Sequence, residues 1–378
     1  MVRHRVNVAR LASAVLVAAG IALAWSVVPA RVAPASELPP RLTDQEFWAL
    51  SERFSEPGGS FRSDNFLSNE RGYQVVIPEL LRVARANRVY LGVGPEQNFP
   101  YLIALKPQLA IIFDIRRGNL HEHLLYKALF EMSRDRADFL SHLWSRPRPD
   151  GLSTGSTVDE LMTAFEASSP SADLYKANLA AVAAWLTKSP HTFGLHDGDL
   201  DGIDYVYRNA FFDGGPGLNY SMAGFGGGGF GNRSTYAELQ MLDDGTGLNR
   251  GFLATEANWL AMKEFESRNL LLPVVGDFGG PSAIRAVGAY LKAQGAVVSA
   301  FYLSNVEQYL NQDGKEDTFL CNVAELPLDE TSTFIYTGSG RYGRGFGGRG
   351  GLNTTFLRPI LPDTAGCRAP SPTAIGDR

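Results

Sequence analysis

The chain has 378 residues, of which 44% are hydrophobic and 20% charged, and its formal net charge is −5 at pH 7. This composition predicts a folded globular body with a large hydrophobic core. The acidic balance leaves no basic surface for phosphate contacts, which excludes nucleic acid as an expected partner.

The N-terminal 35 residues predict export from the cytoplasm. Three arginines among the first ten residues precede an uncharged apolar run over 11–28, and small residues up to Ala35 then offer a cleavage site for signal peptidase. Without cleavage, this run approaches the ~20 residues that cross a bilayer and would anchor the chain in the inner membrane. Both alternatives stay open, and both place the rest of the chain in the periplasm or outside the cell. This segment is the only membrane contact that we expect.

Two helices are expected before the first strand. A linker over 36–42 leads into a helix over 44–54. An amphipathic helix over 72–86 then leads into an apolar run that begins at Val89.

A glycine turn between two apolar runs is the most informative segment of the chain. The run from Val89 ends in Gly92 and Gly94, a helix is expected to open at Glu96, and the second run, over 109–114, ends in Asp114. This is the layout of the first βαβ unit of a nucleotide-binding α/β sheet. Glycines let a ligand approach the end of the first strand, and the acid 20 residues after Gly94 can accept hydrogen bonds from both ribose hydroxyls.

These residues resemble the cofactor half of S-adenosylmethionine-dependent methyltransferases. The longer string over 90–120, together with 274–280 and 301–310, is similar to a family of uncharacterised exported bacterial proteins with a Rossmann-like, methyltransferase-like domain. The resemblance implies that residues 43–362 form this α/β domain, with a mostly parallel sheet flanked by helices. It also implies S-adenosylmethionine as the cofactor.

The same resemblance implies which residues contact the cofactor. We expect Gly92, Gly94 and Asn98 beside it, the ribose on Asp114, and the methionine moiety near Glu96. Glu96 stands where methyltransferases usually carry a third glycine, and the acid that usually precedes the first glycine is also absent. A buried glutamate suits a cationic sulfonium and opposes a pyrophosphate, which counts against NAD or FAD.

The residues after the second strand depart from a compact Rossmann pattern. A crossover helix is expected over 119–133, and an insertion follows over 134–250. The insertion has expected helices over 137–144 and 173–187 and a glycine-rich segment over 214–232. It occupies the place where a third strand is expected, and it serves either as a lid over the crevice or as extra packing.

No metal is expected in the chain. His121 and His123 are two residues apart, so they point to different faces of their helix and do not form a ligand pair. The acids of 197–202 match the first half of a calcium loop, but Arg208 stands where the bidentate glutamate belongs. A helix capped by Asp197 or Asp199 is the preferred interpretation of that segment.

The parallel pattern resumes in two further apolar runs, over 270–276 and 296–303, joined by a helix that Pro281 opens. We expect 270–276 to act as the fourth strand of the sheet. It would then lie beside 89–93, with 109–114 on the opposite side of 89–93.

Polar and aromatic residues follow these two runs and are expected to rim the ligand crevice. They are Asp277, Phe278, Tyr302, Ser304 and Asn305. Asp277 is our first choice for a general base; the alternative is a turn-forming aspartate without a chemical role.

The C-terminal part predicts an edge hairpin. Residues 332–337 and 353–360 are rich in strand formers, and the Arg/Gly-rich segment between them is expected to be a surface loop. The two cysteines, Cys321 and Cys367, either pair in an oxidising compartment or remain free. The tail over 363–378 is expected to be disordered.

Three functions are compatible with these patterns. The first is an exported protein with a methyltransferase-like crevice for a nucleoside-like ligand, which transfers a methyl group from S-adenosylmethionine to an unknown acceptor. The second is a non-catalytic exported or surface binding protein that retains only the fold. The third is an enzyme that binds another nucleotide-like ligand in the same crevice. Fold does not decide among them, so whether the chain is an enzyme stays open.

Overall fold

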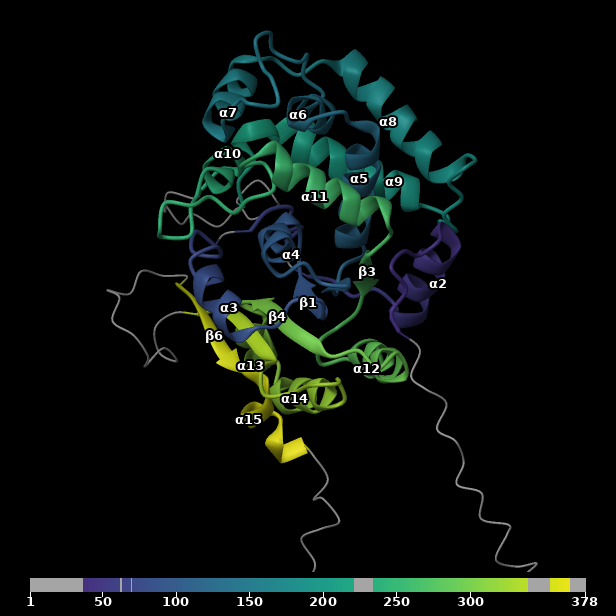
Figure 1. Ribbon diagram of the computed structural model, residues 1–378. Helices are drawn as coiled ribbons and strands as arrows, with labels where there is room; N and C mark the ends of the chain where they lie inside the picture. The colour runs from purple at the N-terminus through teal and green to yellow at the C-terminus, as the bar shows by residue number, and fades with distance from the viewer. Residues whose placement is uncertain (1–36, 62, 69, 221–233, 339–353, 368–378) are drawn as a thin grey trace, which may run out of the picture. The chain divides into compact units, whose positions relative to one another are not determined.

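The sheet has the strand order β3-β2-β1-β4-β5-β6, and its β5–β6 pair is antiparallel whereas the other pairs are parallel (Figure 1). The computed structural model describes residues 37–61, 63–68, 70–220, 234–338 and 354–367. The strands are β1 Val89–Val93, β2 Leu109–Asp114, β3 Leu271–Val275, β4 Val298–Ser304, β5 Thr333–Gly338 and β6 Thr354–Pro359. The predicted α/β class, with a mostly parallel sheet and an antiparallel edge hairpin, is confirmed.

Helices cover both faces of this sheet. Those of the N-terminal half are α2 Asp44–Phe54, α3 Ile77–Val83, α4 Phe99–Leu105, α5 Arg117–Met132, α6 Arg136–Trp144, α7 Val158–Ala167, α8 Ala172–Thr187 and α9 Asp199–Val206. Those of the C-terminal half are α10 Tyr236–Gln240, α11 Glu256–Ser267, α12 Ala283–Ala293, α13 Val306–Gln312, α14 Glu316–Ala324 and α15 Ile360–Asp363. In Figure 1, α5, α6, α8 and α11 lie together on the upper side of the sheet, while α12 and α14 lie on the lower side.

The inner strands are apolar because both of their faces are covered. Every residue of β1, β2 and β3 is buried, so these strands show continuous apolar runs rather than an alternating pattern. Strand β2 pairs with both neighbours along its length, from Val89 opposite Leu109 on one side to Asp114 opposite Val275 on the other. The predicted bounds of β1 and β2 are confirmed.

One of the two predicted neighbours of β1 is confirmed and the other is wrong: 109–114 (β2) pairs with β1, but 270–276 does not. The run 270–276 forms β3, which pairs with β2, and the run 296–303 forms β4, which takes the place beside β1. The prediction assumed that a third strand lay inside the insertion. The described part of the insertion contributes helices and a single isolated bridge between Asn219 and Thr235, so the chain first returns to the sheet at Leu271.

Two local predictions also need correction. The helix expected over 72–86 is confined to Ile77–Val83. Pro78 fits only the first turn of a helix, so the helix cannot extend far upstream of it. The tail expected to be disordered over 363–378 includes the end of α15 and a helical turn at Ala365–Cys367, while residues 368–378 lie outside the described residues.

The insertion packs as a second helical layer above the sheet. Its aromatic side chains pack against α5: Phe139 stacks on Phe130 with ring centroids 4.7 Å apart, and Phe211 lies 5.5 Å from Tyr126. All four side chains are buried. Aromatic burial on this scale stabilises the fold, so the described insertion residues act mainly as packing.

Residues 197–202, which match the first half of a calcium loop, lead into and begin α9. Its N-cap is Gly198, with φ +88°, rather than either predicted aspartate. Asp199 instead accepts hydrogen bonds from Arg117 and from His121 Nε2 at 2.7 Å and 2.8 Å. Within the described ranges, no three His, Cys, Asp or Glu side chains are grouped in a way that could hold a metal ion.

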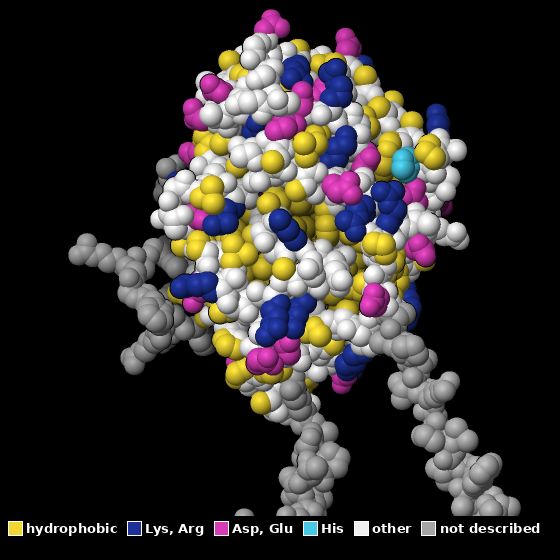
Figure 2. All heavy atoms as spheres, in the orientation of Figure 1, with side chains coloured by type: hydrophobic (Ala, Val, Ile, Leu, Met, Phe, Trp, Pro, Cys, Tyr) yellow, Lys and Arg dark blue, Asp and Glu magenta, His cyan; other side chains and the backbone are white. Residues whose placement is uncertain are grey.

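The surface drawn in Figure 2 mixes acidic and basic side chains rather than separating them by sign. Among the described helices, none is long and apolar enough to cross a membrane. The predicted export segment, residues 1–35, and most of the Arg/Gly-rich loop lie outside the described residues.

The two cysteines form a disulfide that closes the C-terminal end of the domain. Cys321 on α14 is bonded to Cys367, with their Cα atoms 5.0 Å apart and a sequence separation of 46. This contact ties the segment after β6 to the helical layer below the sheet. Of the two alternatives, pairing is confirmed.

We expect the disulfide to contribute to stability through the long loop that it closes. In the chain-entropy model a crosslink over 46 residues stabilises the folded state by about 3–4 kcal/mol. Urea denaturation of the double variant Cys321→Ser, Cys367→Ser is therefore expected to show a lower free energy of unfolding than the oxidised wild type. Reductant should lower the wild type to the same value and leave the double variant unchanged; equal midpoints for oxidised wild type and variant would contradict this prediction.

Candidate functional site

A cavity of about 460 Å³ opens at the carboxyl ends of β1, β2, β3 and β4. It lies where the strand order reverses between β1 and β4, the usual ligand position in open α/β sheets. Its lining residues come from the 60–68 loop, the strand ends and α13: Ser60, Phe61, Asn65, Leu67, Ser68, Val93, Gly94, Pro95, Gln97, Asp114, Ile115, Arg116, Tyr220, Asp277, Phe278, Ser304, Asn305, Val306, Tyr309, Leu310, Gln312, Asp313 and Lys315.

The sequence-predicted site residues divide into two groups. Six of them line the cavity: Gly94, Asp114, Asp277, Phe278, Ser304 and Asn305. Four lie behind it: Gly92, Glu96, Asn98 and Tyr302. The second group shapes the strand ends from within the core and does not face the cavity.

Gly94 is required by the backbone of the turn. Its φ is +78°, in the left-handed region that favours glycine, and a Cβ there would lie 2.6 Å from Gln97 Nε2. A side chain at Gly92 would instead meet Asn98 Oδ1 at 2.0 Å. Gly92 therefore makes room for a protein side chain rather than for a ligand.

Asn98 holds the glycine turn in shape. Its Nδ2 lies 3.0 Å, 3.2 Å and 2.7 Å from the carbonyl oxygens of Val93, Gly94 and Pro95, and its Oδ1 accepts a 2.8 Å hydrogen bond from Tyr90. All of these side-chain contacts are buried. Asn98 is thus a positioning residue of the turn and not the cofactor contact that we predicted.

Glu96 also turns away from the cavity, which corrects its predicted place beside the ligand. Its side chain is buried against α5, where Tyr126 Oη lies 3.5 Å from the carboxylate. Burial raises the pKa of Glu96 to about 8, so it is mostly protonated at neutral pH. Nearby, His123 Nε2 lies 3.0 Å from the Gly94 carbonyl, and burial lowers the pKa of this histidine to about 4. A neutral His123 acts as the donor in that contact.

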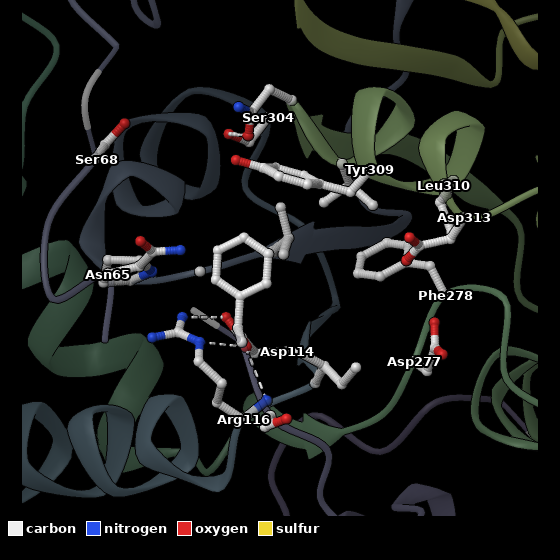
Figure 3. A pocket seen from close by; sticks show the side chains of 18 of the residues that line it. Asn65, Ser68, Asp114, Arg116, Asp277, Phe278, Ser304, Tyr309, Leu310 and Asp313 are labelled. Atoms are coloured by element: carbon white, nitrogen blue, oxygen red, sulfur yellow. Dashed lines mark hydrogen bonds and ion pairs between the residues drawn. The ribbon is translucent and has the colours of Figure 1, made fainter. Parts of the chain in front are cut away.

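Asp114 occupies the predicted place at the end of β2, but its carboxylate is already paired. Arg116 binds it through Nε at 2.9 Å and Nη2 at 2.6 Å, and the Arg116 backbone N–H adds a third hydrogen bond at 2.9 Å (Figure 3). Two parallel N–H···O contacts are the strong, bidentate form of this ion pair. A ligand that uses both oxygens of Asp114 must therefore displace the Arg116 side chain.

Asp277 and Phe278 form another side of the cavity in Figure 3. Lys315 Nζ lies 2.6 Å from the Asp277 carboxylate, and the Asp277 side chain also accepts from the Gly279 N–H at 2.9 Å. Phe278 stacks on Phe301 with ring centroids 5.6 Å apart. Asp277 is accessible to a ligand, but it would act as a base only after losing its Lys315 partner.

The residue that the sequence analysis missed is Glu70. It is 1% exposed and accepts hydrogen bonds from Tyr302 Oη and Thr337 Oγ1, each at 2.7 Å, and from Ser304 Oγ. Burial raises the pKa of Glu70 despite these hydrogen bonds. No sequence motif points to Glu70, because it lies in the loop before α3 and meets strand ends more than 230 residues away.

We expect Asn98→Ala to loosen the glycine turn. The change leaves the buried Tyr90 hydroxyl and up to three carbonyls without a partner, so the free energy of unfolding should fall by about 2–3 kcal/mol. Asn305→Ala is the matched control: it removes a partly exposed cavity amide, and its effect should stay within about 0.5 kcal/mol. Urea denaturation of both variants measures the difference, and an equal effect would contradict the positioning role of Asn98.

Comparison with known proteins identifies a family for this chain. No curated protein matches the chain significantly. The family model described as Domain of unknown function (DUF7790) matches residues 65–188 and 233–347, which is more than half of the chain. These ranges include Glu70, the glycine turn, Asp114, Asp277 and Ser304. The protein therefore belongs to the DUF7790 family.

Proposed function

We propose that the protein binds a nucleoside-like ligand in the cavity at the ends of β1 and β4, with S-adenosylmethionine as the leading candidate. One observation carries this proposal: the turn at Gly94 and the acid at Asp114 open into the same cavity at the reversal of strand order. An acid at the end of the second strand suits a ribose, and a glycine turn at the end of the first suits close backbone approach. The antiparallel β5–β6 edge is also compatible with a methyltransferase-type sheet.

The cavity residues suggest how such a ligand would lie. The ribose would meet Asp114 after Arg116 moves aside, and an aromatic base would find Phe278 along the wall. Asp277 would then lie within the same cavity as the reacting end of the ligand and would be its general base in a methyl transfer. Glu96 takes no part, because it faces the core.

A specific observation favours the second candidate, a binding protein without catalysis. Both candidate acids are neutralised by cations of the same chain, Asp114 by Arg116 and Asp277 by Lys315. Each carboxylate would have to leave its cation partner before it could accept a proton from a substrate. The same cavity would then bind a ligand and leave it unchanged.

We also propose that the protein is exported, as a cleaved or N-terminally anchored chain. The Cys321–Cys367 disulfide supports this location, because disulfides persist in oxidising compartments such as the periplasm and are rare in the cytosol. The basic residues and apolar run of the first 28 residues supply the signal.

Nucleoside binding is tested by calorimetric titration of the chain from Ser36 with S-adenosylmethionine, S-adenosylhomocysteine, NAD and adenosine. Asp114→Ala removes contacts worth ~1.5–3 kcal/mol each, so affinity should fall at least about tenfold. Gly94→Val should abolish binding, because a branched side chain is strained at φ +78° and enters the cavity wall.

Asp173→Asn is the matched control for this titration, since Asp173 is an exposed acid on α8 and does not line the cavity. Its affinity should equal that of the wild type. Asp114→Asn, which preserves the shape of the side chain, separates loss of the acid from loss of folding. Unchanged affinity in both Asp114 variants and in Gly94→Val would place the binding site elsewhere, and no binding of any nucleoside by the wild type would contradict the proposal.

Export is tested by fractionating cells that express the full chain and sequencing the N-terminus of the protein. We expect it outside the cytoplasm, beginning at Ser36 or still bearing residues 11–28 in the inner membrane. An intact Met1 in a soluble cytoplasmic pool would contradict this prediction.

A further inference from the structure

Ser304 stands at the cavity in an unusual backbone conformation. It is the last residue of β4, its φ is +53°, and α13 begins two residues later. A non-glycine residue in the left-handed region carries a conformational cost, and such residues concentrate at functional sites. In Figure 3, Ser304 lies across the cavity from Asp114 and Arg116.

The Ser304 hydroxyl donates a hydrogen bond to a buried carboxylate, that of Glu70. Its Oγ bonds to one oxygen of Glu70, while the other oxygen of Glu70 accepts from Tyr302 and Thr337. This orders the Ser304 hydroxyl so that its hydrogen points into the protein. Ser60 and Ser68 also line the cavity, but neither donates to a carboxylate in the described structure.

Glu70 differs from Asp114 and Asp277 because, among the described residues, no cation pairs with it. Asp114 and Asp277 are paired with Arg116 and Lys315, whereas the described residues around Glu70 contribute only hydroxyl groups. A buried carboxylate without a counter-charge is costly, and packing alone would be served better by a neutral side chain. An unpaired carboxylate is, however, a competent proton acceptor.

We propose that Ser304 is a nucleophile for carboxylic esters that enter the cavity and that Glu70 is its general base. This activity goes beyond nucleoside binding and does not depend on it. Ser304 Oγ forms a bond to the ester carbonyl carbon while its proton passes to Glu70. The alcohol leaves with that proton, giving an acyl-serine, and water then cleaves the acyl group by the same proton transfer and releases the acid.

The chain also contains a Gly-x-Ser-x-Gly pentapeptide, Gly151–Gly155, of the kind that carries the nucleophile in α/β hydrolases. Here its serine, Ser153, is exposed in a turn between α6 and α7 rather than at the end of a strand. Ser153 Oγ contacts the Gly155 N–H and is not among the cavity residues. It therefore provides a matched control for Ser304.

The test uses the chain from Ser36 and a fluorophosphonate probe, in which the serine oxygen bonds to phosphorus and fluoride leaves. We expect peptide mapping by mass spectrometry to place the label on Ser304. Ser304→Ala should abolish labelling and the hydrolysis of p-nitrophenyl acetate above background. Glu70→Gln should slow labelling about 10²-fold or more, the usual contribution of a general base. Ser153→Ala should label at the wild-type rate.

The pH dependence gives a second readout that a purely structural role would not produce. Only ionised Glu70 accepts the proton, so the labelling rate should fall as the pH is lowered through the raised pKa of Glu70. The titratable groups whose charges interact with Glu70 are Tyr90, Tyr101 and Tyr302, and each has a pKa raised well above 10 by burial. The fall in rate therefore reports Glu70.

Circular dichroism and thermal denaturation show whether each variant is folded. If Glu70→Gln does not fold, the wild-type pH profile and Ser304→Ala decide the question. A folded wild type that is not labelled on Ser304, or a folded Glu70→Gln that is labelled at the wild-type rate, would overturn the proposal. Because labelling needs no nucleoside, its failure and a failure of the calorimetric titration are separate results.

Discussion

Burial of the parallel strands on both faces is the constraint on which the rest of the structure depends. Every residue of β1, β2 and β3 is buried, so these strands can carry few polar groups along their length. Polar side chains that could bind or react with a ligand therefore lie at the strand ends. Asp114 closes β2 and Ser304 closes β4, and the reversal of strand order between β1 and β4 leaves a cavity at that edge. The position of the cavity and the residues available in it thus have the same cause.

Local sequence signals predicted the strands and most helices, because hydrophobic runs and turn residues act over a few positions. Helix α2, for example, begins after Thr43, whose side chain accepts the Glu46 N–H while Glu46 accepts the Thr43 N–H, a capping box that is visible in the sequence. The order of the strands in the sheet could not be predicted in this way, because it depends on residues far apart in the sequence. The run 270–276 is apolar enough to be either the third or the fourth strand of the sheet. Which of the two it forms depends on whether the insertion before it contains a strand.

The candidate site, like the fold, could be predicted only where short-range sequence patterns encode it. Gly94 and Asp114 were found because a backbone conformation and a strand end have sequence signatures. Glu96 and Asn98 belong to the same turn, but which of its side chains face the cavity depends on packing against α5 and Tyr90. The contact between Glu70 and Ser304 joins a loop before α3 to the end of β4, and no short-range pattern encodes it.

The family match separates the cavity into two parts with different expected roles. Asp114, Asp277 and Ser304 at the strand ends and Glu70 in the loop before α3 lie within the matched ranges. The lining residues Ser60, Phe61 and Tyr220 lie outside them. Ser304 and Glu70, the nucleophile and base proposed above, therefore both lie in the part of the chain that the family model matches. Ser60 and Phe61 belong to a loop, and loops rather than strands commonly supply the residues that select a ligand. The distinction also follows from the fold, because strand ends are fixed by the sheet while loops vary without cost to the core.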